Sequence, residues 1–263
     1  MQNAIKHSPF TPFLLGTDDP DPVMLSRPHG RADMVLCCDH AGNSVPENLH
    51  MLGLEPANLE KHIGLDVGVF STSHWLAHLL NAPLIAQAYS RLVIDCNRRP
   101  DTSESIPLSS DAVSIPGNEA LEQHDRTARK EEIFKPYHQG IEDLLQKCEQ
   151  FTDHPPTLVA MHSFTREFGG EKRPWDIGVI YGDSSEVGDR VFHALSGYDD
   201  LNIGCNVPYR IDFINDYTLP VHAVQAQRPY VEIEICQDII ASCEGQRRLA
   251  RLLRPIFEQV MQK

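Results

Sequence analysis

The sequence predicts an α/β protein, namely a three-layer αβα sandwich around a mainly parallel, mixed sheet. Three observations favour this class. Short apolar runs of strand length recur along the chain, segments with helical spacing separate them, and polar side chains directly follow several runs. Strands that alternate with helices are typical of a parallel sheet covered on both faces. The 263 residues suffice for one large core, and no composition shift marks a linker.

The elements can be placed in order along the chain. Residues 1–30 are rich in Pro, Asp and His and predict an extended N-terminal arm, followed by a single domain over 31–263. Apolar runs predict strands at 34–38, 83–88, 91–94, 157–161, 176–181, 201–205 and 230–235. Helical spacing predicts helices at 67–80, 118–151, 186–195, 219–227 and 246–262. We expect Pro136 to kink or divide the second helix, and residues 100–118 to form a long loop or lid.

Four predicted strands end in polar side chains. The pairs Asp39-His40 and His162-Ser163 follow two apolar runs, Glu234 lies near the end of another, and Asp95-Cys96-Asn97-Arg98 follows residues 91–94. Ligands of open α/β sheets bind beyond the carboxyl ends of the strands. If these strands are parallel, the four ends lie on one edge and define a site.

His40 and His162 are candidate metal ligands. A neutral imidazole suits a divalent ion, zinc above all, although a single histidine at a strand end more often only forms hydrogen bonds. Two histidines with a nearby carboxylate favour the metal interpretation. Asp66 could be the third ligand or a helix N-cap, and Glu47 is a further candidate that also fits a solvated first-turn glutamate.

Glu232 and Glu234 lie two residues apart in a strand and therefore point to the same face. They could belong to an edge strand with a solvated face. Alternatively, Glu234 is a general base that removes a proton from an attacking water beside the metal, with Glu232 as a second candidate for this role.

Arginines on the same edge predict an acidic ligand. A guanidinium binds a carboxylate through two hydrogen bonds, which a lysine cannot do. Arg91, Arg98 and the amide of Asn97 are therefore candidate substrate-binding groups, and Arg173, in a later loop, is placed to close over the substrate. Arg91 and Arg98 could also be ordinary surface charges.

Charge and cysteine content narrow the function classes. The formal net charge of −14 disfavours nucleic acid and anionic lipid as partners. The seven cysteines include no CxxC pair, and no apolar run is long enough to span a membrane. These features predict a soluble protein with reduced thiols in the cytoplasm, and they leave its oligomeric state open.

Five segments of the chain, taken together, resemble the N-formylglutamate amidohydrolase family. They are residues 38–46, 65–68, 89–98, 162–165 and 231–235, and the most specific is Ser-Arg-x-Val-Ile-Asp-x-Asn-Arg at 90–98. The resemblance implies the αβα fold of zinc-dependent exopeptidases with one zinc ion per chain. It implies His40 and His162 as ligands, Glu234 as the base, and Asn97-Arg98 as the pair that holds the substrate carboxylate.

The chain departs from the related carboxypeptidases at one ligand. Those enzymes carry His-x-x-Glu, whereas the third residue after His40 is Asn43, so Asp66 is the preferred acidic ligand. The sequence thus predicts a metal-dependent amidohydrolase that cleaves the N-formyl or short N-acyl amide of an acidic amino acid such as N-formylglutamate. The alternatives are a carboxypeptidase or deacylase of the same fold, and a non-catalytic protein that binds an acidic metabolite.

Overall fold

The computed structural model describes residues 13–182 and 185–261. Its main strands are β1 (Val23–Ser26), β2 (Met34–Cys38), β3 (Leu84–Gln87), β6 (Thr157–Phe164), β9 (Ile177–Ile180), β10 (Ile203–Cys205) and β11 (Tyr230–Cys236). Two small ribbons pair β4 (Ser109–Ser110) with β5 (Val113–Ser114) and β7 (Glu167–Phe168) with β8 (Glu171–Lys172). The α-helices are α1 (Pro56–Leu59), α2 (Val69–Leu80), α3 (Gln123–Arg129), α4 (Lys135–Glu149), α5 (Glu186–Leu195) and α6 (Cys243–Met261).

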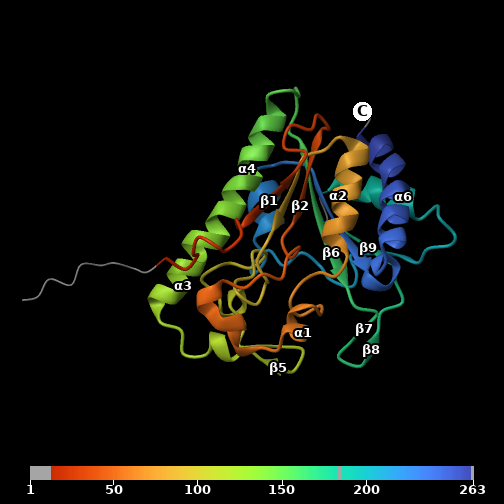
Figure 1. The fold of residues 1–263 in the computed structure, drawn as a ribbon. Helices are drawn as coiled ribbons and strands as arrows, with labels where there is room; N and C mark the ends of the chain where they lie inside the picture. Colours follow the sequence, from red (N-terminus) through yellow and green to blue (C-terminus); the bar gives the residue numbers. More distant parts are fainter. Residues whose placement is uncertain (1–12, 183–184, 262–263) are drawn as a thin grey trace, which may run out of the picture.

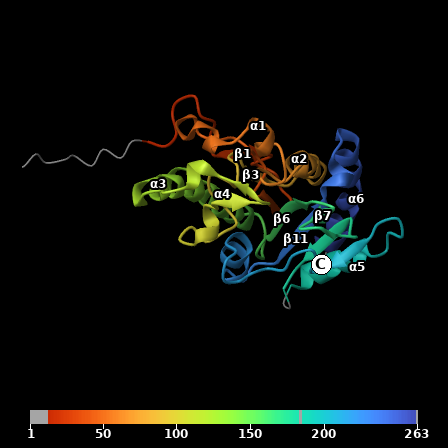
Figure 2. The same ribbon diagram turned by 90° about the horizontal axis from the view of Figure 1, so that it is seen from below.

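The seven main strands form one mixed sheet in the order β1-β3-β2-β6-β11-β9-β10. Neighbouring strands run parallel except in the pairs β1 with β3 and β11 with β9. Helices cover both faces of this sheet, with α3 and α4 on one side and α2 and α6 on the other (Figures 1 and 2). The predicted three-layer αβα fold with a mainly parallel, mixed sheet is therefore confirmed.

The central strands β2, β3, β6 and β11 contribute to two cores because successive side chains point to opposite faces. On β6, Leu158 and Ala160 pack in the core beneath α4, whereas Val159 and Met161 pack against the α2, α5 and α6 layer. The same alternation continues to the end of β6, so His162 points to the face of Leu158. Strands buried on both faces are nearly continuous apolar runs, which explains why they are easy to identify in the sequence.

The helical region predicted at 118–151 runs from Gln123 to Glu149 without a non-helical residue, so Pro136 does not divide it as expected. A π-helical turn over Lys130–Phe134 separates α3 from α4, and the backbone N–H of Lys135 bonds the carbonyl of Lys130. Pro136 lies in the first turn of α4, where a residue without an N–H group is tolerated. The chain thus continues as a helix through the proline.

The strand predicted at 91–94 is wrong, because this apolar segment forms a turn next to the sheet. Its carbonyls find side-chain partners in place of a neighbouring strand. Asn118 Nδ2 donates to the carbonyl of Leu92 at 2.8 Å, and Arg129 Nη1 donates to that of Val93 at 2.8 Å. Arg129 is fully buried, so its guanidinium makes this hydrogen bond inside the core. Apolar composition alone does not distinguish such a segment from a strand.

Other boundaries differ in detail. Residues 1–12 of the predicted N-terminal arm lie outside the described residues, and Val23–Ser26 of the same arm forms the edge strand β1, antiparallel to β3. The helix predicted at 219–227 is a π-helical turn over Pro220–Val224.

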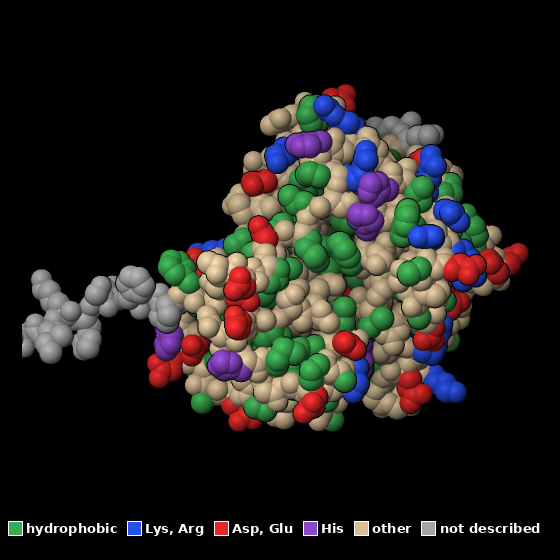
Figure 3. Space-filling model, viewed as in Figure 1, with side chains coloured by type: hydrophobic (Ala, Val, Ile, Leu, Met, Phe, Trp, Pro, Cys, Tyr) green, Lys and Arg blue, Asp and Glu red, His purple; other side chains and the backbone are tan. Residues whose placement is uncertain are grey.

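The surface charge is uneven. In the space-filling view, basic side chains gather over α6 and histidines over α2 (Figure 3), although the chain as a whole carries a net charge of −14. Within the described residues, none of the helices combines the length and apolar character needed to cross a bilayer.

Candidate active site

Polar side chains from three parallel strands meet at one edge of the sheet. His40 follows β2, His162 lies near the end of β6, and Glu234 on β11 is directly opposite His162 in the strand register. They line a cavity of about 240 Å³ together with Arg91 and Asn97. The expected convergence of strand ends is therefore present, and the 91–98 segment reaches this edge as a loop.

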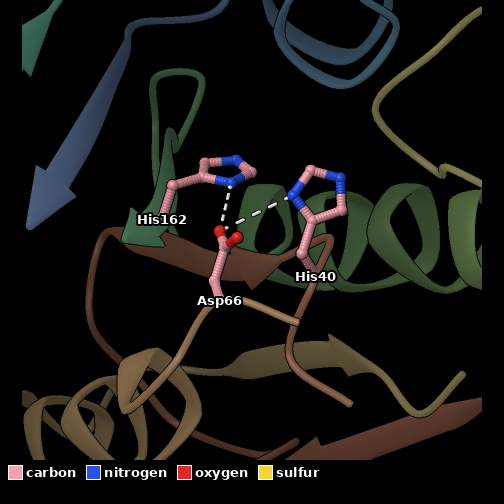
Figure 4. Close-up of side chains that lie close together, drawn as sticks. All are labelled: His40, Asp66 and His162. Atoms are coloured by element: carbon pink, nitrogen blue, oxygen red, sulfur yellow. Dashed lines mark hydrogen bonds and ion pairs between the residues drawn. The ribbon is translucent and has the colours of Figure 1, made fainter. Parts of the chain in front are cut away.

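His40, Asp66 and His162 form a compact buried group (Figure 4). Asp66 Oδ2 lies 2.9 Å from His162 Nδ1 and 3.6 Å from His40 Nδ1. One donor atom from each residue falls within 4.8 Å of the others. Ligand atoms around a tetrahedral zinc ion are about 3.3 Å apart, so this spacing suits a divalent ion.

A carboxylate lies behind each imidazole. His40 Nε2 lies 2.7 Å from Asp95 Oδ1, and His162 Nε2 lies 3.2 Å from Asp39 Oδ2. A proton on each Nε2 leaves each Nδ1 free to donate its lone pair to a metal, and carboxylates in this position orient such ligands in metalloenzymes. His40 Nδ1 is buried and has no hydrogen-bond partner among the described residues. The donor set therefore fits a metal ion.

Asp39 is the anchor behind His162. Its Oδ1 accepts hydrogen bonds from Tyr137 Oη at 2.9 Å and from Thr218 Oγ1 at 2.8 Å. Burial by itself would lower the pKa of His162, but the carboxylates of Asp39 and Asp66 outweigh it and raise that pKa well above the usual value. Such concentrated negative charge favours a cation at this point.

Asp66 is positioned by backbone contacts rather than by a helix. Its N–H donates to the carbonyl of His40 at 2.8 Å, and its Oδ2 accepts from the Ser163 N–H at 3.2 Å. The N-cap of α2 is Gly68, so Asp66 does not have the alternative capping role. Glu47 is exposed in the 3₁₀ turn Glu47–Gly53 and is not among the residues that line the cavity.

Glu234 and Glu232 project from β11 into the cavity and both are almost buried. Burial raises the pKa of Glu234 well above its usual value, and it raises that of Glu232 to about 7. A carboxylate with a raised pKa is a stronger base once ionised. The prediction that these residues share a face is confirmed, and the solvated edge strand is excluded because β11 lies between β6 and β9.

The predicted substrate-binding residues are not equivalent. Arg91 and Arg98 line the cavity, with Arg91 Nη2 at 3.3 Å from Asp66 Oδ1. Asn97 also lines it, but its Oδ1 accepts a hydrogen bond from the Thr218 N–H at 3.1 Å. Arg173 is not among the lining residues and donates to Tyr209 Oη at 3.0 Å, so it reaches the cavity only through that tyrosine.

Several lining residues were not predicted. The loop before the π-helical turn Pro220–Val224 contributes Arg210, Asp212 and Asp216, and Glu104 comes from the 100–118 segment. The roles of Asp39 and Asp95 behind the histidines were also missed. Their positions beside strand ends were the available signal, but sequence spacing does not show which histidine a carboxylate contacts.

Comparisons with known proteins place this chain in a family. The sequence profile described as N-formylglutamate amidohydrolase matches residues 32–241. A crystal structure of a gene product from Agrobacterium tumefaciens is 28% identical, with a TM-score of 0.89, over 94% of this chain and 98% of that chain. An N-formylglutamate amidohydrolase from Ralstonia eutropha has the same fold, with 19% identity and a TM-score of 0.68 over 92% of this chain and 97% of that chain. No curated protein sequence matches the chain. Because the profile covers well over half of the 263 residues, the chain belongs to the N-formylglutamate amidohydrolase family and is an amide-acting hydrolase.

Proposed function

We propose that this protein is a metal-dependent amidohydrolase that cleaves the N-formyl, or another short N-acyl, amide of an amino acid, with N-formylglutamate as the reference substrate. The observation that carries the proposal is the buried group of His40, Asp66 and His162, with a carboxylate behind each imidazole and Glu234 facing the same cavity. Zinc is the proposed ion, since two imidazoles and one carboxylate are a common catalytic donor set for it.

The ion, when bound, supplies a Lewis acid that polarises the amide carbonyl and makes the attacking water more acidic. His40, Asp66 and His162 would hold it, while Asp95 and Asp39 keep the two imidazoles in the required tautomer and orientation. The expected products are formate, or another short acid, and the free amino acid.

Glu234 is the proposed general base. It would accept the proton of the attacking water and pass it to the leaving amine. Its Oε2 is buried and has no hydrogen-bond partner among the described residues, so the carboxylate is available for this transfer. Burial in the cavity wall would hold it against the reacting amide.

Arg91 and Arg98 are the proposed anchors for a substrate carboxylate, and they would fix the amide relative to Glu234. Arg91 Nε is buried without a partner among the described residues, which leaves it free to donate to substrate. We also propose a cytoplasmic location, because all seven cysteines are unpaired and five of them are buried.

The test is an assay of a panel of N-formyl and N-acetyl amino acids with purified protein, with and without added zinc and after chelation. We expect stoichiometric formate or acetate release that chelation abolishes and zinc restores. No release from any member of the panel by zinc-loaded protein would contradict the proposal and favour a non-catalytic binding protein. Release that survives complete metal removal would contradict the metal assignment.

A further inference from the structure

Arg98, one of the two proposed anchors for a substrate carboxylate, has one side of its guanidinium already occupied. Its Nη1 pairs with Asp216 and also donates to the carbonyl of Asn97 at 3.2 Å. A carboxylate that binds a guanidinium through two parallel hydrogen bonds needs two neighbouring N–H groups on one edge of the planar fork. Because Nη1 is taken, the edge formed by Nε and Nη2 remains for a substrate carboxylate.

This remaining edge already has an acidic neighbour within the protein. Glu104 Oε2 lies 3.6 Å from Arg98 Nε, and the side chain lines the same cavity. Glu104 belongs to the 3₁₀ turn Ser103–Ser105, within the 100–118 segment for which the sequence predicts a long loop or lid. The Glu104 carboxylate therefore lies at the place where a substrate carboxylate would bind Arg98.

The two acidic partners of Arg98 differ in how firmly they are held. The Asp216 side chain is 14% exposed, and its Oδ2 accepts a hydrogen bond from the Asp212 N–H at 2.8 Å. The Glu104 side chain is 58% exposed and forms no hydrogen bond with the described residues. An exposed ion pair at this distance contributes little free energy and is readily exchanged. Asp216 is thus a fixed partner, whereas Glu104 can leave.

Glu104 is also not needed to orient Arg98. A backbone bridge joins Arg98 to Asp216, and the two contacts of Nη1 fix the plane of the guanidinium. If Glu104 moved away, the Nε and Nη2 edge would still face the cavity. A contact that neither holds the arginine nor adds appreciable stability has one remaining effect, which is to compete with other anions for that edge.

We infer that Glu104 is an internal competitor for Arg98, which a carboxylate of the substrate must displace, and that this competition raises KM. The inference rests on the proposed function, in which Arg98 anchors a substrate carboxylate. Both the α-carboxylate and the side-chain carboxylate of N-formylglutamate have the required chemistry. A neutral group on the substrate has no charge with which to replace Glu104, so its binding does not depend on this residue.

The experiment compares KM in zinc-loaded wild type and Glu104→Gln for N-formylglutamate, N-formylglutamine and N-formyl-γ-aminobutyrate. The second substrate lacks the side-chain carboxylate and the third lacks the α-carboxylate. In the variant, we expect KM for N-formylglutamate to fall about three- to fivefold with kcat unchanged, the size of an exposed ion pair. The analogue that lacks the carboxylate bound by Arg98 should show no change in KM, and the other analogue should show the same decrease.

Two further variants separate local competition from a general effect of charge. Glu104→Asp keeps the charge but withdraws it by one methylene group, so KM for N-formylglutamate should still fall. Glu119→Gln removes an exposed glutamate outside the cavity and should leave KM unchanged. Calorimetric titration with free glutamate gives a readout that does not require turnover, and its Kd should fall in Glu104→Gln by the same factor as KM.

An unchanged or raised KM for N-formylglutamate in Glu104→Gln would overturn the inference and leave the proposed function intact. An equal decrease for all three substrates would also overturn it, because a general charge effect would then explain the result. The absence of hydrolysis of all three substrates by the wild type would instead count against the proposed function.

Discussion

The two halves of the cavity differ in the polar groups that the protein leaves without a partner. In the metal half, the buried Nδ1 of His40 and Oε2 of Glu234 have no hydrogen-bond partner among the described residues, although Asp95 holds the other nitrogen of His40. In the amino-acid half, Arg98 is paired with Asp216, and the buried Nε of Arg91 has no partner in the described part of the chain. The difference indicates that the metal half is built to hold a cation and to accept a proton, whereas the amino-acid half is built to hold an anion.

We expect the largest effect to be the loss of turnover caused by a substitution in the metal half of the cavity. Glu234→Gln preserves the shape of the side chain but cannot accept a proton, so kcat should fall on the order of a thousandfold. Zinc content should remain unchanged because Glu234 is not one of the three proposed ligands. Steady-state kinetics and metal analysis of the same sample check both points. Near-normal turnover would remove the base assignment.

Asp95, which contacts His40 from behind, should control the affinity of the site for zinc. Asp95→Asn removes the charge that His40 Nε2 contacts at 2.7 Å, and we expect zinc affinity to fall about 10- to 100-fold. Competition with a chelating dye measures this change. The control Asp101→Asn alters an exposed carboxylate paired with Lys130 and should have no effect. Equal affinity in both variants would show that the metal half is less preorganised than we propose.

A buried histidine pair contacts the backbone of the segment that carries Asn97. His138 Nδ1 lies 3.0 Å from His222 Nε2, and His138 Nε2 lies 2.9 Å from the carbonyl of Cys96, next to Asn97. Burial, with His222 adding to it, lowers the pKa of His138 to about 3. The unfolded chain therefore binds a proton below about pH 6.5 that the folded protein excludes, and stability must fall as pH decreases from there toward 3.

We expect His138→Gln to remove part of this acid sensitivity. When the pH is lowered from 6.5 to 4.5, the free energy of unfolding decreases in both proteins. We expect the decrease to be about 2 kcal/mol smaller in the variant than in the wild type. Urea denaturation across this range provides the measurement, with the exposed His193→Gln as control. Parallel pH profiles for His138→Gln and wild type would contradict a neutral His138.

The smallest effect is expected at Arg173. Its guanidinium lies 4.8 Å from the Phe168 ring and 4.9 Å from the Tyr209 ring, so it shapes the cavity through Tyr209. Arg173→Gln should raise KM about two- to fivefold with kcat unchanged, the size of an exposed cation–π contact. A loss of a hundredfold or more in kcat/KM would instead assign Arg173 to direct substrate binding.

Sequence patterns predicted the fold and the metal half better than the amino-acid half. His40 and His162 follow apolar strands that parallel pairing brings together, so their meeting follows from topology. Asp66 was harder to assign because it lies in a loop, and the turn at 91–94 depends on Arg129, a residue with no local signal. The charges of Arg210, Asp212 and Asp216 come from a loop whose path is set by long-range contacts, such as Thr218 with Asn97.

The most direct test of the account is cobalt titration of metal-free protein, followed by visible absorption. We predict one ion per chain with the intense spectrum of a four- or five-coordinate site in the wild type, and loss of that spectrum in His40→Ala, Asp66→Ala and His162→Ala. A wild-type protein that hydrolyses its substrate without binding any ion, or a spectrum that all three substitutions leave intact, would contradict it.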